Sequence, residues 1–141
     1  MISTGTFFRP LGRRWILDYL NSALMPHYSE ISQMKTRIMY IELKSDCGDR
    51  GPSRIGRLRF SKSGSSVYYG GTRFETLKGR GVSGNYLNVE TGDEYWISGC
   101  KKNGQDRHWA GSGPVEIDED VREEYWTEIR GKPEHKGKGI A

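Results

Sequence analysis

The feature that most limits the possible folds is a series of short segments in which apolar and polar residues alternate. Glycine- and serine-rich turn residues separate these segments, as in 45–53, 61–65 and 76–85. Alternation with a period of two puts apolar side chains on one face of an extended strand and polar side chains on the other. A chain with this pattern therefore buries its apolar faces by joining several short strands in one sheet.

The run 86–102 has the highest density of aromatic and β-branched residues, and it predicts a β-hairpin at the centre of the sheet. Leu87 and Val89 alternate with polar neighbours in its first strand. The Thr-Gly-Asp sequence at 91–93 supplies turn residues, and Tyr-Trp-Ile at 95–97 resumes the strand.

Further strands are predicted on both sides of this hairpin, at 37–43, 55–60, 67–74, 107–109 and 115–117. The strand at 107–109 is expected because Asn-Gly at 103–104 is a strong turn signal that returns the chain. Within 55–60, Arg57 and Arg59 alternate with the apolar residues Leu58 and Phe60. We therefore expect the two arginines to share the outward face.

The apolar period changes near residue 118, where 118–130 predicts an amphipathic helix. Asp118 is suited to cap its N-terminus, and Gly131 followed by Pro133 ends it. Its apolar stripe consists of Val121, Tyr125 and Ile129, with Trp126 beside them. We interpret this stripe as core that packs against the sheet; a binding surface for a protein partner is the alternative.

These elements together predict one mainly β domain over 34–131, a small SH3-like or partly open antiparallel barrel of five or six strands with a C-terminal helix. Residues 132–141 are basic and glycine-rich, which favours a flexible tail. Residues 1–33 form a separate N-terminal extension, in which 13–25 has the apolar spacing of a short helix. The extension is either a docking segment or sequence upstream of a natural start at Met34.

The positive charge is concentrated in the middle of the chain. Residues 34–108 contain 14 Lys and Arg against 8 Asp and Glu, whereas 109–141 contain 5 against 8. A basic middle region permits contact with nucleic acid or phosphate. The alternative is a solvated surface whose charges pair within the molecule.

Basic side chains interleaved with aromatic ones are typical of surfaces that bind single-stranded nucleic acid. The candidate contact residues are Arg57, Arg59, Lys62, Tyr68, Arg73, Trp96, Lys101 and Lys102. Tyr86 is a further aromatic residue that we expect on the outward face.

No pattern of catalytic or metal-binding residues stands out. The acidic run 116–124 is typical of a helix N-terminus, and His108 lacks a recognisable partner in the sequence. Cys47 and Cys100 are far apart and form no CxxC pair, which favours free thiols in the cytoplasm over a metal site. No run of about 18 apolar residues is present. We therefore predict no catalytic residues, no cofactor, no metal and no membrane partner, and the oligomeric state stays open.

Four runs carry a resemblance to a known family: MKTRIMYIE at 34–42, RIGR at 54–57 with FSKSG at 60–64, YWISGCKK at 95–102, and VEIDEDVREEYWTEIRG at 115–131. They resemble a small bacterial family of short cytosolic proteins labelled 1-deoxy-D-xylulose-5-phosphate synthase. That label implies a thiamine-diphosphate transferase with large α/β domains and a Gly-Asp-Gly motif that helps hold Mg²⁺ and diphosphate. The chain has only Gly48-Asp49-Arg50 and Gly92-Asp93-Glu94 at the nearest positions, so the resemblance implies a family and transfers no site residues.

The sequence therefore predicts a small cytosolic binding module that contacts nucleic acid through a basic sheet face. An accessory subunit that binds a protein partner is the first alternative. An enzyme with the activity of the family label is the second.

Overall fold

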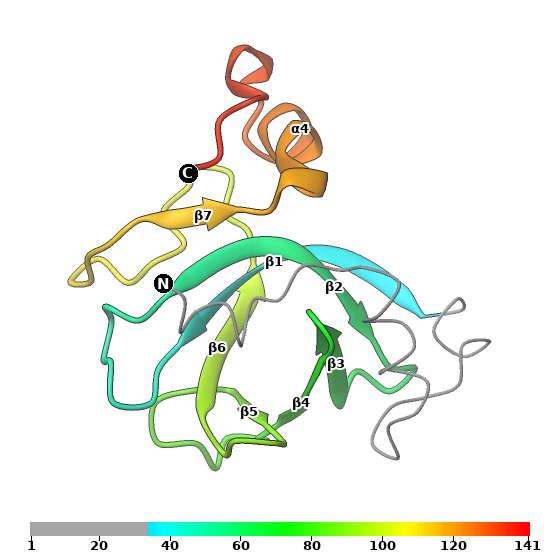
Figure 1. Cartoon of the computed structure of the whole chain (residues 1–141), viewed down its shortest axis with the longest axis vertical. Coiled ribbons are helices and arrows are strands. Elements are labelled where there is room, and N and C mark those ends of the chain that lie inside the picture. The colour runs from blue at the N-terminus through cyan, green and yellow to red at the C-terminus, as the bar shows by residue number, and fades with distance from the viewer. Residues whose placement is uncertain (1–33) are drawn as a thin grey trace.

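A six-stranded antiparallel barrel forms the main part of the computed structural model, which describes residues 34–141 (Figure 1). Its strands are β1 (Lys35–Leu43), β2 (Ser53–Phe60), β3 (Ser66–Tyr69), β4 (Thr72–Thr76), β5 (Tyr86–Asn88) and β6 (Glu94–Gly99). They follow the order β1-β6-β5-β4-β3-β2, and the pairing of β1 with β2 closes the barrel. This confirms the predicted mainly β barrel, and the closure removes the sheet edges that a partly open barrel would expose.

The C-terminal part of the chain packs on the outside of the barrel; we call residues 115–141 the C-terminal cover. It begins with β7 (Val115–Ile117), which pairs in parallel with the first half of β2. A continuous helical segment follows, made of a 3-10 turn (Glu119–Val121), one α turn named α4 (Arg122–Glu124) and a π turn (Tyr125–Ile129). Gly131 has a φ of +64°, a left-handed conformation that suits the end of a helix, as predicted.

The apolar residues form two cores, one on each face of the curved sheet. The core inside the barrel includes Ile41, Leu58, Phe74 and Ile97. The second core lies between the outer face of β1 and β2 and the cover, and it contains Tyr40, Ile55, Ile117, Val121, Tyr125 and Trp126. The stripe of the predicted helix is thus core, because Tyr125 is 0% exposed and Trp126 is 4% exposed.

The predicted hairpin forms from β5 and β6, with Tyr86 opposite Tyr95. This register turns Tyr86 and the buried Asn88 toward the interior and Leu87 away from it, so the expected outward position of Tyr86 is wrong. The inward position of Asn88 has a local cause, because its side-chain oxygen accepts hydrogen bonds from the amides of Glu90 and Thr91 in the turn.

The segment 107–109 is a loop and not the predicted strand. The turn before it forms as expected, with Gly104 at a φ of +77°. The chain then does not return along β6, because β6 already lies between β1 and β5 and has no free edge. The Arg107 side chain instead reaches to the loop after β1 and to the start of β2.

Two predictions for the C-terminal part are corrected. Asp118 makes no capping hydrogen bond; its carboxylate instead accepts hydrogen bonds from Arg54 Nε, at 2.7 Å, and from the Tyr69 hydroxyl. Residues 132–141 were expected to be a flexible tail, yet they form a 3-10 turn (Pro133–His135) and a bridge between Ile140 and Glu116. This bridge is possible because β7 leaves one edge unpaired, and the last residues cover it.

The prediction of an extension that ends at residue 33 concerns positions outside the described residues. Among residues 34–141, no helix has the length and apolar character that crossing a membrane requires.

Candidate functional site

The strand register brings five of the eight candidate nucleic-acid residues together on the outer face of the barrel or in the turn beside it. Arg59 on β2 lies directly opposite Tyr68 on β3, and Tyr68 lies opposite Arg73 on β4. Residues paired in this way share a face, with Cβ atoms about 5 Å apart. Arg57 is two positions before Arg59 on the same face, and Lys62 is exposed in the turn after β2. We call Arg57, Arg59, Lys62 and Arg73 the arginine face.

Acidic neighbours partly neutralise this face. The Arg57 Nη2 atom lies 2.7 Å from Glu124 Oε1, in a pair whose side chains are 33% and 48% exposed. Arg73 Nη2 lies 3.2 Å from Glu75 Oε1 and also donates to Ser66. Tyr68 is only 7% exposed, so its ring packs within the surface and does not offer a stacking platform.

The other three candidates lie elsewhere on the barrel. Trp96 on β6 is opposite Glu42 on β1, and Lys101 and Lys102 follow the end of β6. The helical segment of the cover lies between the two groups: Glu124 at its middle accepts a hydrogen bond from Arg57, and Arg130 after its end donates to the Lys102 carbonyl. The eight candidates therefore form two groups.

Trp96 and Lys101 of the second group line a pocket of about 320 Å³ on the outer surface. Its walls come from β1 (Glu42 and the adjoining Lys44), β6 (Trp96) and three loops (Asp49; Ser83; Lys101, Asp106 and His108). One exposed apolar side chain lines it, and two others belong to sequence neighbours of lining residues. Trp96 is 40% exposed, Val82 beside Ser83 is 95% exposed, and Trp109 beside His108 is 90% exposed.

A buried glutamate lies in the wall of this pocket. Glu42 is 1% exposed, and its carboxylate accepts a hydrogen bond of 2.7 Å from the Tyr40 hydroxyl. The other oxygen lies 3.0 Å from Arg107 Nη1 and 3.3 Å from Lys44 Nζ. A buried carboxylate is stable in the charged form only when it is paired and hydrogen-bonded, and Glu42 meets both conditions.

Arg107 connects Glu42 in the pocket wall to the segments around it. Its side chain is 10% exposed, and its guanidinium donates to the carbonyls of Asp49, Gly51 and Pro114 at 3.0–3.3 Å. It also donates to Ser53 Oγ at 2.6 Å. One residue therefore joins the loop after β1, the start of β2 and the segment before β7.

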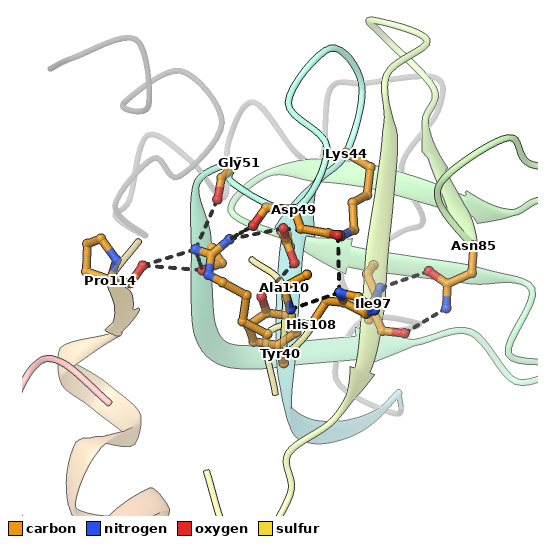
Figure 2. Close-up of polar contacts among 12 residues, drawn as sticks. Tyr40, Lys44, Asp49, Gly51, Asn85, Ile97, His108, Ala110 and Pro114 are labelled. Atoms are coloured by element: carbon orange, nitrogen blue, oxygen red, sulfur yellow. Dashed lines mark hydrogen bonds and ion pairs between the residues drawn. The ribbon is translucent and has the colours of Figure 1, made fainter. Parts of the chain in front are cut away.

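Asp49 contacts two other residues of the pocket wall, as Figure 2 shows for Lys44 and His108. Its carboxylate bonds Lys44 Nζ, and its other oxygen lies 3.3 Å from His108 Nδ1. The hydrogen bond from Lys44 is the main cause that lowers the pKa of Asp49.

The pKa of Asp106 is shifted in the opposite direction to that of Asp49. It is 8% exposed, and burial raises its pKa above the ordinary value. Its Oδ1 atom accepts the backbone amide of Lys101 at 2.7 Å, and its Oδ2 atom is buried with no hydrogen-bond partner among the described residues.

Glu94 fixes the loop that carries Val82 and Ser83. Its carboxylate accepts backbone N–H bonds of 2.8–3.0 Å from residues 82–84. These three hydrogen bonds lower the pKa of Glu94. The exposed Val82 is therefore held at the rim by a strand residue.

The sequence pattern did contain a signal for this pocket. Tyr40, Glu42 and Lys44 alternate with the interior residues of β1, which marks an outward face that is unusually polar for a strand under a cover. The role of Arg107 carried no such signal, because its partners are mostly backbone carbonyls distant in sequence.

The pocket wall contains carboxyl groups and amines in similar number, with three carboxyl groups (Glu42, Asp49 and Asp106) beside two lysines, and it also contains one histidine. Within residues 34–141, no three His, Cys, Asp or Glu side chains are grouped in a way that could hold a metal ion. No protein-family model, curated protein or solved structure matches the chain. The resemblance to the synthase-labelled family therefore stays a prediction.

Proposed function

We propose that this protein is a binding module that contacts the phosphate backbone of single-stranded nucleic acid through its arginine face. The observation that carries the proposal is the register Arg59–Tyr68–Arg73 across three adjacent strands, with Arg57 and Lys62 beside it. Arginine is well suited to this contact, because its planar guanidinium can donate two parallel hydrogen bonds to a phosphate.

Contact with phosphates and not with bases is proposed because Tyr68 is 7% exposed. Without an aromatic platform on this face, binding does not depend on base sequence. Four cations that each replace one counterion give a slope of about −3 for the logarithm of the association constant against the logarithm of salt concentration.

The internal ion pairs compete with the ligand, because Glu124 and Glu75 occupy Arg57 and Arg73 in the free protein. Exposed pairs of this kind are weak, so a phosphate can displace the carboxylate. Removing the Glu124 charge is therefore expected to tighten nucleic-acid binding.

Fluorescence anisotropy with labelled oligo-dT and oligo-U, at two salt concentrations, tests the proposal. Glu124→Gln is expected to bind more tightly than the native protein, whereas Arg57→Ala and Arg59→Ala together lower the salt slope by about 1.4. Glu128→Gln is the matched control, because Glu128 lies on the same helical segment and is exposed. Negligible binding at low salt, or equal effects of Glu124→Gln and Glu128→Gln, would refute the proposal.

The alternative of a protein-binding helix has less support. The apolar stripe of this helical segment is buried in the second core, where Val121 and Tyr125 are both 0% exposed. Binding a partner through that stripe would require the cover to separate from the barrel.

A further inference from the structure

The pocket beside Trp96 is notable because its wall includes an exposed large apolar side chain, and two more follow or precede wall residues in the sequence. Residues 34–141 contain four large apolar residues with exposed side chains, namely Val82, Trp96, Trp109 and Ile140. Three of the four line the pocket or directly adjoin a residue that lines it. Isolated exposed apolar residues are normal, but a group around one concave site marks a contact surface.

The polar groups of the pocket do not favour an anionic ligand. Glu42 and Asp49 already engage Lys44, and Asp49 also engages His108. Lys101 is the remaining exposed lysine of the wall. The buried Asp106 lies close enough to interact electrostatically with it. A phosphate would therefore meet little net positive charge, which separates this pocket from the arginine face.

Asp106 is the polar residue of the pocket wall whose hydrogen bonding is incomplete among the described residues. Its Oδ2 atom is buried and unpartnered among the described residues, although the residue is 8% exposed and lines the pocket. Leaving such an oxygen without a hydrogen bond is costly. No water-sized group reaches Oδ2 in this conformation, so a ligand hydroxyl can bond it only when the carboxyl group turns toward the pocket. A hydroxyl then suits the charged and the protonated carboxyl group alike, because it both donates and accepts.

We propose that this pocket binds one neutral sugar ring, with the apolar face of a pyranose against Trp96 and its hydroxyl groups toward Asp106, Lys44 and His108. The volume of about 320 Å³ is at the small end of ligand sites, which suits a single ring. Carboxylates that accept and ammonium groups that donate alternate in the wall, and sugar hydroxyls match both. A nucleobase is the competing ligand, but its edge offers a fixed pattern of donors and acceptors and it normally carries phosphate.

The test is a titration of the ¹⁵N-labelled full chain, followed by the indole N–H resonances of its four tryptophans. The probes are methyl glycosides of glucose, galactose and mannose. Sorbitol provides similar hydroxyl groups without a ring, and guanosine provides a base. A ligand of about a dozen heavy atoms is expected to saturate its site on the order of 1 mM.

The expected result is a saturable shift of the Trp96 indole with at least one glycoside and none with sorbitol. Trp96→Ala removes saturable binding and Trp96→Phe weakens it several-fold, whereas Ile140→Ala, which alters an exposed apolar residue on the β7 side, leaves it unchanged. Asp106→Asn weakens binding roughly tenfold, unlike the exposed control Asp120→Asn. No saturable shift with any glycoside, equal shifts with sorbitol, or a response to guanosine alone would overturn the proposal.

Discussion

Arg107 offers the sharpest test of how the cover, the barrel and the pocket wall are held together. Arg107→Ala removes the guanidinium that lies 3.0 Å from the buried Glu42 and satisfies three backbone carbonyls. Breaking a buried ion pair by removing one partner costs roughly 3–5 kcal/mol. Lys44, at 3.3 Å, still compensates Glu42, so we expect the lower end, about 3 kcal/mol. This is a large part of the roughly 5–15 kcal/mol by which domains are stable.

Urea denaturation, followed by tryptophan fluorescence, measures this loss as a lower midpoint with an unchanged slope. Arg50→Ala is the control, because Arg50 is exposed and forms no ion pair among residues 34–141. Combining Arg107→Ala with Glu42→Gln completes a double-mutant cycle, and the two changes are expected to cost at least about 1 kcal/mol less than their sum. An Arg107→Ala effect within about 0.5 kcal/mol of the control, or full additivity in the cycle, would contradict the reasoning.

Three further predictions follow from other contacts. Gly56→Ala places a Cβ atom 2.7 Å from the Tyr69 ring and against Asp118. This overpacking should lower the free energy of unfolding by about 1–3 kcal/mol in the same urea assay. An unchanged urea midpoint would argue against this contact. Glu94 has a lowered pKa in the folded state, so its contribution to stability is full above its unfolded value near 4.5 and is lost as the pH falls through the folded pKa. Between pH 7 and pH 3, the urea midpoint of Glu94→Gln should therefore fall less steeply than that of the native protein. Parallel curves for the two proteins would show that Glu94 does not contribute to the pH dependence of stability. Burial raises the pKa of Cys100 to about 12, so a thiol reagent at pH 8 should label Cys100 far more slowly in the native protein than in urea, as peptide mapping would reveal.

The strands and the C-terminal stripe could be predicted from sequence because they depend on local periodicity. Leu58 and Phe60 alternate with Arg57 and Arg59, and this alternation alone gives the faces of β2. The steps of four after Val121 likewise indicate an apolar stripe, although the segment divides into 3-10, α and π turns.

The remaining features depend on contacts between distant positions. Asp118 has the sequence context of a helix cap, but Arg54 and Tyr69 are better partners once β7 lies beside β2. The separation of Lys101 from the arginine face likewise depends on where the cover packs. Local pattern carries no information on either point, because both are decided by tertiary pairing.

The second hydrophobic core also has a consequence for synthesis, since it joins parts of the chain that leave the ribosome at different times. Residues 35–99, which form the barrel, are made before 115–141, so Tyr40 and Ile55 stay uncovered in the nascent chain. Apolar surface of this kind is where unfinished chains aggregate. Glu42 and Lys44 extend the same face of β1, and their charges interrupt it until the cover arrives. The Glu42–Lys44 pair lies within 35–99 and can therefore form at this stage, whereas the Glu42–Arg107 pair has to wait for the later residue.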